Sequence, residues 1–404
     1  MMWETYAIKE IYEGLYDGPH ATPPLSDNGA IFLGISNITE DGHLDFSDIK
    51  YISENDLPRW TKRVVPRGGD IVFSYEATLN RYAIIPEDFH GCLGRRMALI
   101  RPNQKKALGK FLYYYFFSDQ WRQTIAENTV VGATVDRIPI IKFPQFPISL
   151  PDLNTQQKIA DILSAYDDLI ENNQKQIKLL EEAAQRLYKE WFIDLRFPGH
   201  ENTPIHDGLP EGWEKKSAEY FFEITIGKTP PRAEKQWFVD GKDGIPWVSI
   251  SDMGESGTYI FNTAEGLTRD AIIKHNIKVV PKGTILVSFK LTVGRVSIAT
   301  INMCTNEAIA HFRMDDIHRS YTYLYLKAFG YDELGNTSSI SKAVNSKIIK
   351  AMPFVMPDEK TLVAFSRTVS PLLNVIYFKQ NQNNKLIETR KLLLLELMNR
   401  EFEA

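Results

Sequence analysis

The chain has 404 residues, of which 43% are hydrophobic and 24% charged, with a formal net charge of -4. This length suits two domains, and with no apolar run near the roughly 20 residues of a membrane helix we expect no membrane span. Two cysteines without a CxxC pair and an acidic N-terminus without a secretion signal exclude a disulfide framework and predict a cytoplasmic protein without a metal site.

Motifs from the first half of the chain recur in the second half in the same order. Trp-Glu at residues 3–4 recurs at 213–214, Thr-Pro-Pro at 22–24 recurs at 229–231, and Val-Val-Pro-Arg-Gly at 64–68 recurs, with Lys for Arg, at 279–283. The spacings, 210, 207 and 215 residues, drift only as insertions in loops would make them, and self-similarity of this kind is typical of an internal structural repeat. We therefore expect one architecture built twice, with the halves related by a pseudo-two-fold axis.

Each half predicts a strand-rich domain followed by one long helix. Residues 1–150 and 195–356 contain short β-branched and aromatic runs between Gly, Pro and Asn turns. Residues 151–194 and 357–404 each begin with Pro-Asp, whose acid suits a helix N-terminus, and continue with helical periodicity. The predicted fold class is α+β, with two strand-rich domains joined and spaced by two long antiparallel coiled-coil helices.

Apolar residues alternate at spacings of three and four in both helices, which predicts a helix-pair seam. The seam comprises Ile159, Leu163, Ile170, Asn173, Ile177, Leu180 and Leu187 in the first helix, and Ile376, Asn383, Leu386 and Leu393 in the second. Asn173 and Asn383 either pair and set the register or face solvent where the helices diverge. Pro371 is expected to kink the second helix. At about 1.5 Å per residue, the first helix makes a spacer on the order of 50 Å long.

The join between the halves carries the most specific motifs. Residues 153–159 (Leu-Asn-Thr-Gln-Gln-Lys-Ile), 208–214 (Gly-Leu-Pro-Glu-Gly-Trp-Glu), 227–230 (Gly-Lys-Thr-Pro) and 247–252 (Trp-Val-Ser-Ile-Ser-Asp) follow one another in a characteristic order. In this order, and in residues 17–24, the chain resembles the specificity subunits of type I restriction-modification systems along essentially its whole length. It departs from the family in the interrupted seam of the second helix.

The resemblance implies two target-recognition domains, each of which reads one half of a split, asymmetric sequence in double-stranded DNA. It also implies that the helices set the gap between the halves and dock two adenine-methyltransferase subunits, which are joined by restriction (translocase and endonuclease) subunits. The chain itself is expected to catalyse nothing and to bind no cofactor. S-adenosylmethionine, ATP and Mg are expected in the partner subunits.

Basic residues concentrate in two windows despite the acidic total. Residues 50–110 hold twelve Lys or Arg against six Asp or Glu, and residues 271–300 hold five basic residues and no acid. Base readout needs side chains with hydrogen-bonding groups on loops. The candidates are Arg81 and Arg295, at equivalent repeat positions, then Asn80 and Lys290, and in second rank Ser36, Asn37, Ser249 and Ser251. The alternative for both arginines is a surface pair with a nearby acid.

Clustered cations elsewhere suit phosphate contacts, which raise affinity without reading sequence. These candidates are Lys62, Arg63, Arg67, Arg95, Arg96 and Lys282, and a plain solvated face is their alternative. Trp3 and Trp213, which open the two halves, are predicted to be core anchors rather than base stackers.

An enzyme would need a catalytic constellation, and the sequence contains no GxxxxGK[ST], GxGxxG or HExxH motif. The second hypothesis is a coiled-coil assembly scaffold without sequence-specific DNA reading. A scaffold gains nothing from the unopposed basic run at residues 271–300, so the sequence favours a DNA reader.

Overall fold

The structure is a computed structural model that describes residues 3–132, 135–334 and 345–399. The chain forms two compact units. The first unit comprises Met1–Ile170 and Leu386–Ala404, and the second comprises Glu171–Lys385. Both long helices are divided between the units because each contributes apolar side chains to both cores. The four-segment division made from the sequence stays a prediction.

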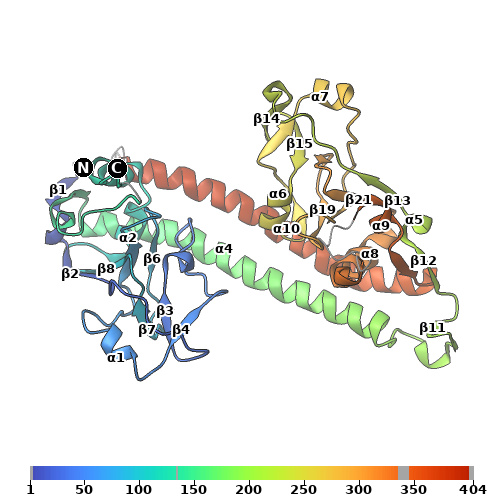
Figure 1. Cartoon of the computed structure of the whole chain (residues 1–404), viewed down its shortest axis with the longest axis horizontal. Coiled ribbons are helices and arrows are strands. Elements are labelled where there is room, and N and C mark those ends of the chain that lie inside the picture. The colour runs from blue at the N-terminus through green and yellow to red at the C-terminus, as the bar shows by residue number, and fades with distance from the viewer. Residues whose placement is uncertain (1–2, 133–134, 335–344, 400–404) are drawn as a thin grey trace. The chain divides into compact units, whose positions relative to one another are not determined.

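In the first unit, antiparallel strands form a sheet in the order β2-β8-β5-β6, and β3 pairs parallel with β7 and antiparallel with β4 (Figure 1). The strands are β1 (Glu4–Ala7), β2 (Tyr12–Asp17), β3 (Ala30–Leu33), β4 (Lys50–Ile52), β5 (Ile71–Ser74), β6 (Tyr82–Ile84), β7 (Gly91–Leu93), β8 (Met97–Pro102) and β9 (Pro147–Leu150). The shorter helices are α1 (Leu57–Trp60), α2 (Gly109–Tyr115) and α3 (Asp119–Asn128). Strands β1 and β9 pair separately, so the beginning of the chain and the segment just before α4 lie side by side.

The second unit repeats this plan, with sheets ordered β13-β21-β18-β19-β16 and β14-β17-β15-β20 and a separate β12-β22 pair. Its strands are β10 (Ile205–His206), β11 (Leu209–Pro210), β12 (Glu214–Ser217), β13 (Glu223–Ile226), β14 (Phe238–Asp240), β15 (Ile245–Val248), β16 (Tyr259–Ile260), β17 (Glu265–Leu267), β18 (Ile285–Ser288), β19 (Val296–Ala299), β20 (Cys304–Thr305), β21 (Ile309–Arg313) and β22 (Pro353–Met356). Its shorter helices are α5 (Ala218–Phe221), α6 (Ile250–Glu255), α7 (Arg269–Lys274), α8 (Asp316–Ala328) and α9 (Ser346–Lys350). The repeat predicted from the sequence motifs is therefore confirmed in the strand pairing.

Buried aromatic side chains build both cores. Trp3 is buried against Phe111 and Tyr115, and Trp213 is buried against Phe192 and Phe197, at ring-centroid distances of 5.2–6.3 Å. Both tryptophans are therefore core anchors, as the sequence predicted. Replacing a buried aromatic side chain of this kind by alanine typically lowers the free energy of unfolding by about 3–5 kcal/mol.

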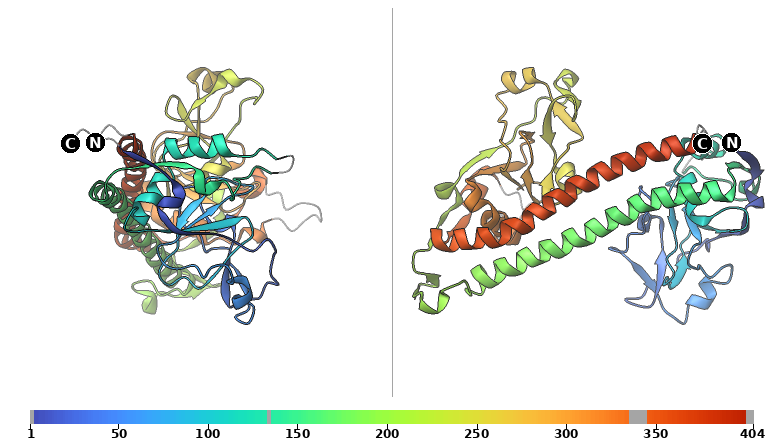
Figure 2. Two further views of the ribbon diagram at one scale, coloured as in Figure 1. Left: turned by 90° about the vertical axis from the view of Figure 1, so that its left-hand side faces the viewer. Right: turned by 180° about the vertical axis from the view of Figure 1, so that it is seen from behind.

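The first long helix, α4 (Leu153–Tyr188), ends in a wider turn at Lys189–Ile193, and the second, α10, spans Glu359–Met398. Asp152 caps α4 by accepting hydrogen bonds from the backbone N–H groups of Asn154 and Thr155. Pro371 lies inside α10, and the helix continues through it without a break (Figure 2). Val369, Leu373 and Ile376 are all buried around this position, so tertiary packing holds the helix together where the proline removes one backbone hydrogen bond.

The two helices run antiparallel within each unit. In the first unit, Ile159 and Leu163 of α4 share a core with Leu397 and Met398 of α10. In the second unit, the buried Asn173 donates hydrogen bonds to Asn383 Oδ1 at 2.8 Å and Gln382 Oε1 at 2.9 Å, and accepts one from Lys379 Nζ at 3.1 Å. The remaining seam positions are buried at Ile170 and Ile376 and half-buried at Ile177, Leu180, Leu187, Leu386 and Leu393.

Asn173 and Asn383 are thus paired by a hydrogen bond and are both buried, so they do not face solvent. Their role in fixing the register of the helices stays a prediction. α10 is also long and apolar enough to cross a membrane by length and composition, contrary to the expectation from the sequence. Its apolar residues Phe365, Val369 and Ile376 belong to the core of the second unit, and a packed core helix passes the same test.

Candidate nucleic-acid interface

Several connections meet at one end of the main sheet in each unit. Asp17 at the end of β2 pairs with Ala98 of β8, and Ser74 at the end of β5 pairs with Met97, the first residue of β8. The ends of β2 and β5 therefore lie beside the beginnings of β6 and β8. The connection after β3 joins them, since Gly94 donates a backbone hydrogen bond to Leu33. We call this end the loop edge. It comprises residues 18–24, 34–40, 75–81 and 94–96 in the first unit, and residues 227–232, 249–255, 289–295 and 306–308 in the second.

The loop that joins the central strands has the same conformation in both units. Ser74 Oγ donates to the carbonyl of Thr78, and Ser288 Oγ donates to the carbonyl of Thr292. Left-handed backbone occurs at Ala77 and Asn80 in the first unit, and at Leu291 and Gly294 in the second. Asparagine and glycine tolerate this conformation best, so the backbone alone accounts for the choice of residue at Asn80. Base reading by Asn80 stays a prediction.

Arg81 and Arg295 occupy the same position, where the loop enters the next strand. Arg81 Nη2 lies 4.0 Å from Glu40 Oε2, and Arg295 Nη1 donates to the carbonyl of Ile250 at 2.5 Å. Both guanidinium groups therefore lie against the connection that follows β3 or β15. The long Arg81–Glu40 contact is the acid pairing weighed as the alternative, and pairs of this kind contribute little energy, about 0–1 kcal/mol.

The repeated Ile-Ser-Asn and Ile-Ser-Asp motifs cap the turns after β3 and β15. Asn37 is 5% exposed, accepts a hydrogen bond from the Gly34 N–H at 3.0 Å and donates to the carbonyls of Asp45 and Asp48. Asp252 accepts from the Ser249 N–H at 2.7 Å, and Ser249 Oγ contacts its carboxylate. Asn37 therefore caps the turn after β3, and Ser249 shares a capping box with Asp252, so both side chains are engaged within the protein. Base reading by Asn37 and Ser249 stays a prediction.

The capping spacing of three residues was visible in the sequence and was overlooked. Ser36 and Ser251 remain exposed on the same turns and stay candidates. Ser251 Oγ also donates to Glu255 Oε1 at 3.1 Å.

The phosphate candidates do not gather in one place. Arg63 reaches the loop edge, where its Nη1 contacts Asp17 and the Gly18 carbonyl, and Arg96 pairs with Glu76 at 3.5 Å. Arg95 is exposed beside Arg96, and Lys62 is exposed next to Arg63. Arg67 and Lys282 precede β5 and β18, whereas the loop edge follows those strands, so a four-residue strand of about 13 Å separates them from it.

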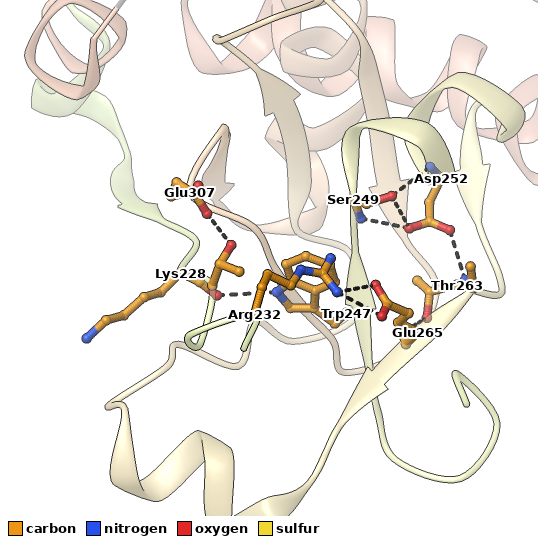
Figure 3. Close-up of polar contacts among 10 residues, drawn as sticks. Lys228, Arg232, Trp247, Ser249, Asp252, Thr263, Glu265 and Glu307 are labelled. Atoms are coloured by element: carbon orange, nitrogen blue, oxygen red, sulfur yellow. Dashed lines mark hydrogen bonds and ion pairs between the residues drawn. The ribbon is translucent and has the colours of Figure 1, made fainter. Parts of the chain in front are cut away.

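In the second unit the loop edge carries further cations that the sequence analysis did not single out. Arg232 forms two hydrogen bonds with Glu265, at 2.7 and 2.8 Å, while Lys228 lies on the same turn (Figure 3). Glu307 accepts a hydrogen bond from Thr229. Burial acts to raise the pKa of the Glu307 carboxyl, but this hydrogen bond and the charges of Lys290 and Arg232 outweigh it and lower the pKa. The sequence shows that Arg232 directly follows a Pro-Pro turn, which could have marked it as a candidate. Its partner Glu265, however, lies 33 residues further along the chain, so the pair could not be predicted.

Two glycines allow the strands to meet at this edge. The Gly18 N–H donates to the Met97 carbonyl at 2.7 Å, and the Gly227 N–H donates to the Ile309 carbonyl at 3.1 Å. A Cβ at Gly227 would overlap Thr305 and the Asn306 carbonyl, and one at Gly18 would overlap the Gly94 carbonyl. Only glycine therefore fits where the turn crosses the chain that follows β20 or β7.

His311 is buried beneath the loop edge of the second unit, between two threonines. Its Nδ1 lies 2.9 Å from Thr225 Oγ1 and its Nε2 lies 2.7 Å from Thr305 Oγ1, and burial lowers the pKa of the imidazole to about 4. The folded protein therefore holds this histidine neutral. Its contribution to stability is fully present above the unfolded pKa of about 6.5 and is lost as the pH falls toward 4.

We expect urea unfolding of the second unit, followed by tryptophan fluorescence, to show this dependence. Between pH 7.5 and pH 5 the native protein should lose about 2 kcal/mol more stability than His311→Gln, which cannot take up a proton. Carboxylates titrate equally in both proteins, so the difference isolates the histidine. Identical pH profiles for the two proteins would contradict the burial of a neutral His311.

Among the residues that the structure describes, no group of three or more His, Cys, Asp or Glu side chains could hold a metal ion. Cys92 and Cys304 are both buried and free, and burial raises the pKa of each thiol to about 12.

The architecture matches known proteins. The family model described as the type I restriction modification DNA specificity domain matches residues 2–182 and again residues 210–389. The chain belongs to this family. Because the model matches once in each half, the internal repeat and the family assignment support each other, and the resemblance noted from the sequence motifs is confirmed. The description of this family model names DNA specificity as the role of the domain.

Similar proteins extend over nearly the full length. The type I restriction enzyme HindI specificity subunit of Haemophilus influenzae is 24% identical and covers 89% of this chain and 91% of its own length. The putative MjaX specificity subunit of Methanocaldococcus jannaschii is 25% identical over 96% of this chain and 91% of its own. The crystal structure of the type I restriction-modification S subunit from M. genitalium has the same fold, with a TM-score of 0.59, 17% identity, and coverage of 98% and 96%.

Proposed function

We propose that this specificity-domain protein recognises a two-part DNA sequence for a type I restriction-modification complex, and that each unit reads one half of the target through its loop edge. The observation that carries the proposal is the recurrence of one loop edge in both units, with cationic side chains at each. These are Arg63, Arg81, Arg95 and Arg96 in the first unit, and Lys228, Arg232, Lys290 and Arg295 in the second. Two copies of one fold with different side chains suit an asymmetric target.

The scaffold alternative is not favoured. A scaffold would need the paired helices but would not need cations at the loop edge of both units. Phosphate neutralisation by Lys and Arg supplies most of the affinity of a DNA-binding protein, so these cations have a direct use in a reader.

Exposed apolar side chains on the long helices support docking of methyltransferase subunits. Large apolar side chains are exposed on α4 and α10 at Ile162, Leu169, Leu179, Val375, Phe378, Ile387 and Leu392. Such side chains are typical of protein–protein contacts when they form a row. We infer that two adenine-methyltransferase subunits with S-adenosylmethionine bind here, that a restriction subunit supplies ATP- and Mg-dependent cleavage, and that the complex works in the cytoplasm.

The test is to map adenine methylation in cells that express this chain with its methyltransferase partner. We expect a split motif, whose gap reflects the length of the helices. Arg81→Ala should relax one half of the motif and Arg295→Ala the other, because each removes donors from one loop edge. Lys105→Ala, exposed at the opposite end of β8, should leave both halves unchanged.

A host with the active methyltransferase but no new motif would overturn the proposed function. A split motif that neither arginine variant alters would leave the function standing and remove Arg81 and Arg295 from the base contacts.

A further inference from the structure

The turn after β13 holds one arginine in a fixed position at the surface. The guanidinium of Arg232 lies over the rings of Phe238 and Trp247, at 4.3 and 4.5 Å from their centroids. Its Nη1 donates to both carboxylate oxygens of Glu265. The side chain nevertheless remains 49% exposed. Arg232 is therefore oriented by neighbours on two strands, and one edge of its guanidinium faces away from them (Figure 3).

The residues that contact Arg232 are themselves fixed in place by hydrogen bonds and by strand pairing. Trp247 is 2% exposed and donates its Nε1–H to the Lys228 carbonyl at 3.3 Å, which ties β15 to the turn that carries Arg232. Glu265 lies on β17, which pairs on both sides with β14 and β15. The capping residue Asp252 accepts a hydrogen bond at 2.9 Å from the backbone N–H of Ala264, the residue directly before Glu265. Hydrogen bonds thus connect the turn after β15 to the strand that positions the arginine.

The exposed ion pair and the two cation–π contacts do little more than offset the side-chain entropy lost when the arginine is ordered. They fix the orientation of Arg232 without a large gain in stability. Within the described residues, the Nε and Nη2 groups of Arg232 have no hydrogen-bond partner. Two parallel N–H donors on an ordered, planar group match the O6 and N7 acceptors that guanine presents in the major groove.

The surroundings suit nucleic acid. Lys228 and Lys290 are exposed on the same edge, where they can meet phosphates. In the first unit the equivalent position, directly after the Pro-Pro turn, is Leu25, which is 52% exposed and has no side-chain donor. The same backbone position therefore offers different chemistry in the two units, as readers of different half-sequences require.

We propose that Arg232 reads a guanine in the half-site bound by the second unit, by donating from Nε and Nη2 to O6 and N7, and that Glu265 is its positioning residue. This inference rests on the proposed function and adds a base identity to it.

The first test maps the methylation motif of the complex with Arg232→Lys and Arg232→Ala. The native complex should require a G·C pair at one position of one half-site, and both variants should accept other pairs there while the other half stays unchanged. The matched control is Arg313→Lys, because Arg313 is 47% exposed and pairs with Glu223, but lies at the opposite end of β21. This control should leave the motif intact.

The second test measures binding of the purified complex to DNA in which 7-deazaguanine, which lacks N7, replaces that guanine. The native complex should lose about tenfold in affinity, since a bidentate pair contributes about 1–3 kcal/mol of discrimination. The Arg232→Ala complex should be insensitive to the replacement. Glu265→Gln should lower this sensitivity while binding to unrelated DNA stays constant, which separates positioning from a loss of fold.

Each outcome decides the matter. A split motif that both Arg232 variants leave unchanged overturns the guanine assignment but not the proposed function. Uniform weakening on all sequences by Arg232→Ala identifies a phosphate contact and also overturns it. If the alanine variant fails to assemble, the lysine variant and the 7-deazaguanine result on native protein decide. Absence of any motif with the native chain removes the proposed function, and this inference with it.

Discussion

Arg390→Ala is expected to destabilise the first unit by about 3–5 kcal/mol, because it leaves the buried carboxylate of Asp167 without its charged partner. Arg390 Nη1 contacts Asp167 Oδ1, and the Tyr114 hydroxyl donates to Asp167 Oδ2 at 2.6 Å. The two charged side chains are only 20% and 16% exposed. Burial, and then the Asp167 charge, raise the pKa of Tyr114. The three groups bind α10, α4 and α2 to one another within this unit.

Urea unfolding and hydrogen exchange in the last turns of α10 measure the effect. Lys391→Ala changes an exposed neighbour on the same helix and should shift stability by less than about 0.5 kcal/mol. The double variant Asp167→Leu with Arg390→Leu should recover most of the loss, because apolar replacement of a buried pair is often neutral. If Arg390→Ala behaved like Lys391→Ala, the pair would have no structural role.

Gly227→Ala is expected to abolish recognition of one half-site, and Gly18→Ala recognition of the other. The new methyl group would overlap backbone atoms that belong to the neighbouring turn in each case. Overpacking of this kind costs about 1–3 kcal/mol and moves the backbone. In the second unit the displaced turn carries Lys228 and Arg232, so the methylation motif should lose at least one specified half while α4 and α10 still assemble with the partners.

Methylation mapping with the assembled complex checks this result for each variant separately. Gly330→Ala provides the control, since a Cβ there meets nothing within 4 Å. It should leave both the motif and the thermal midpoint unchanged. A Gly227→Ala complex with the native motif would mean that the turn after β13 does not position the DNA-contacting residues.

Periodic and local features were predictable from the sequence. The two long helices, the aromatic anchors Trp3 and Trp213, and the repeat itself follow from spacings and motif order that need no knowledge of distant contacts. The equivalence of Arg81 and Arg295 could also be predicted from the sequence, because the segment that precedes each of them, from Ser74 or from Ser288, has the same length in both halves. The capping role of Asn37 was readable in principle, since a capping box is a local pattern.

Contacts between distant segments were not predictable. Arg232 was overlooked because its importance depends on Phe238, Trp247 and Glu265, which only the strand order β14-β17-β15 brings to one place. Arg67 and Arg96 looked alike in a basic window, but they lie at opposite ends of the sheet. Pro371 was expected to kink α10, and the structure shows that α10 continues through it as one helix, with Val369 and Leu373 buried beside it.

The sequence by itself determined that this chain is a duplicated α+β protein with two long helices and the motif order of a DNA specificity subunit, because hydrophobic period and motif order are properties of the chain. Only the tertiary structure decided which polar side chains are free to contact DNA. A side chain's availability depends on the partners that fold around it, and these partners come from strands tens of residues away, as Glu265 does for Arg232 and Asp17 for Arg63.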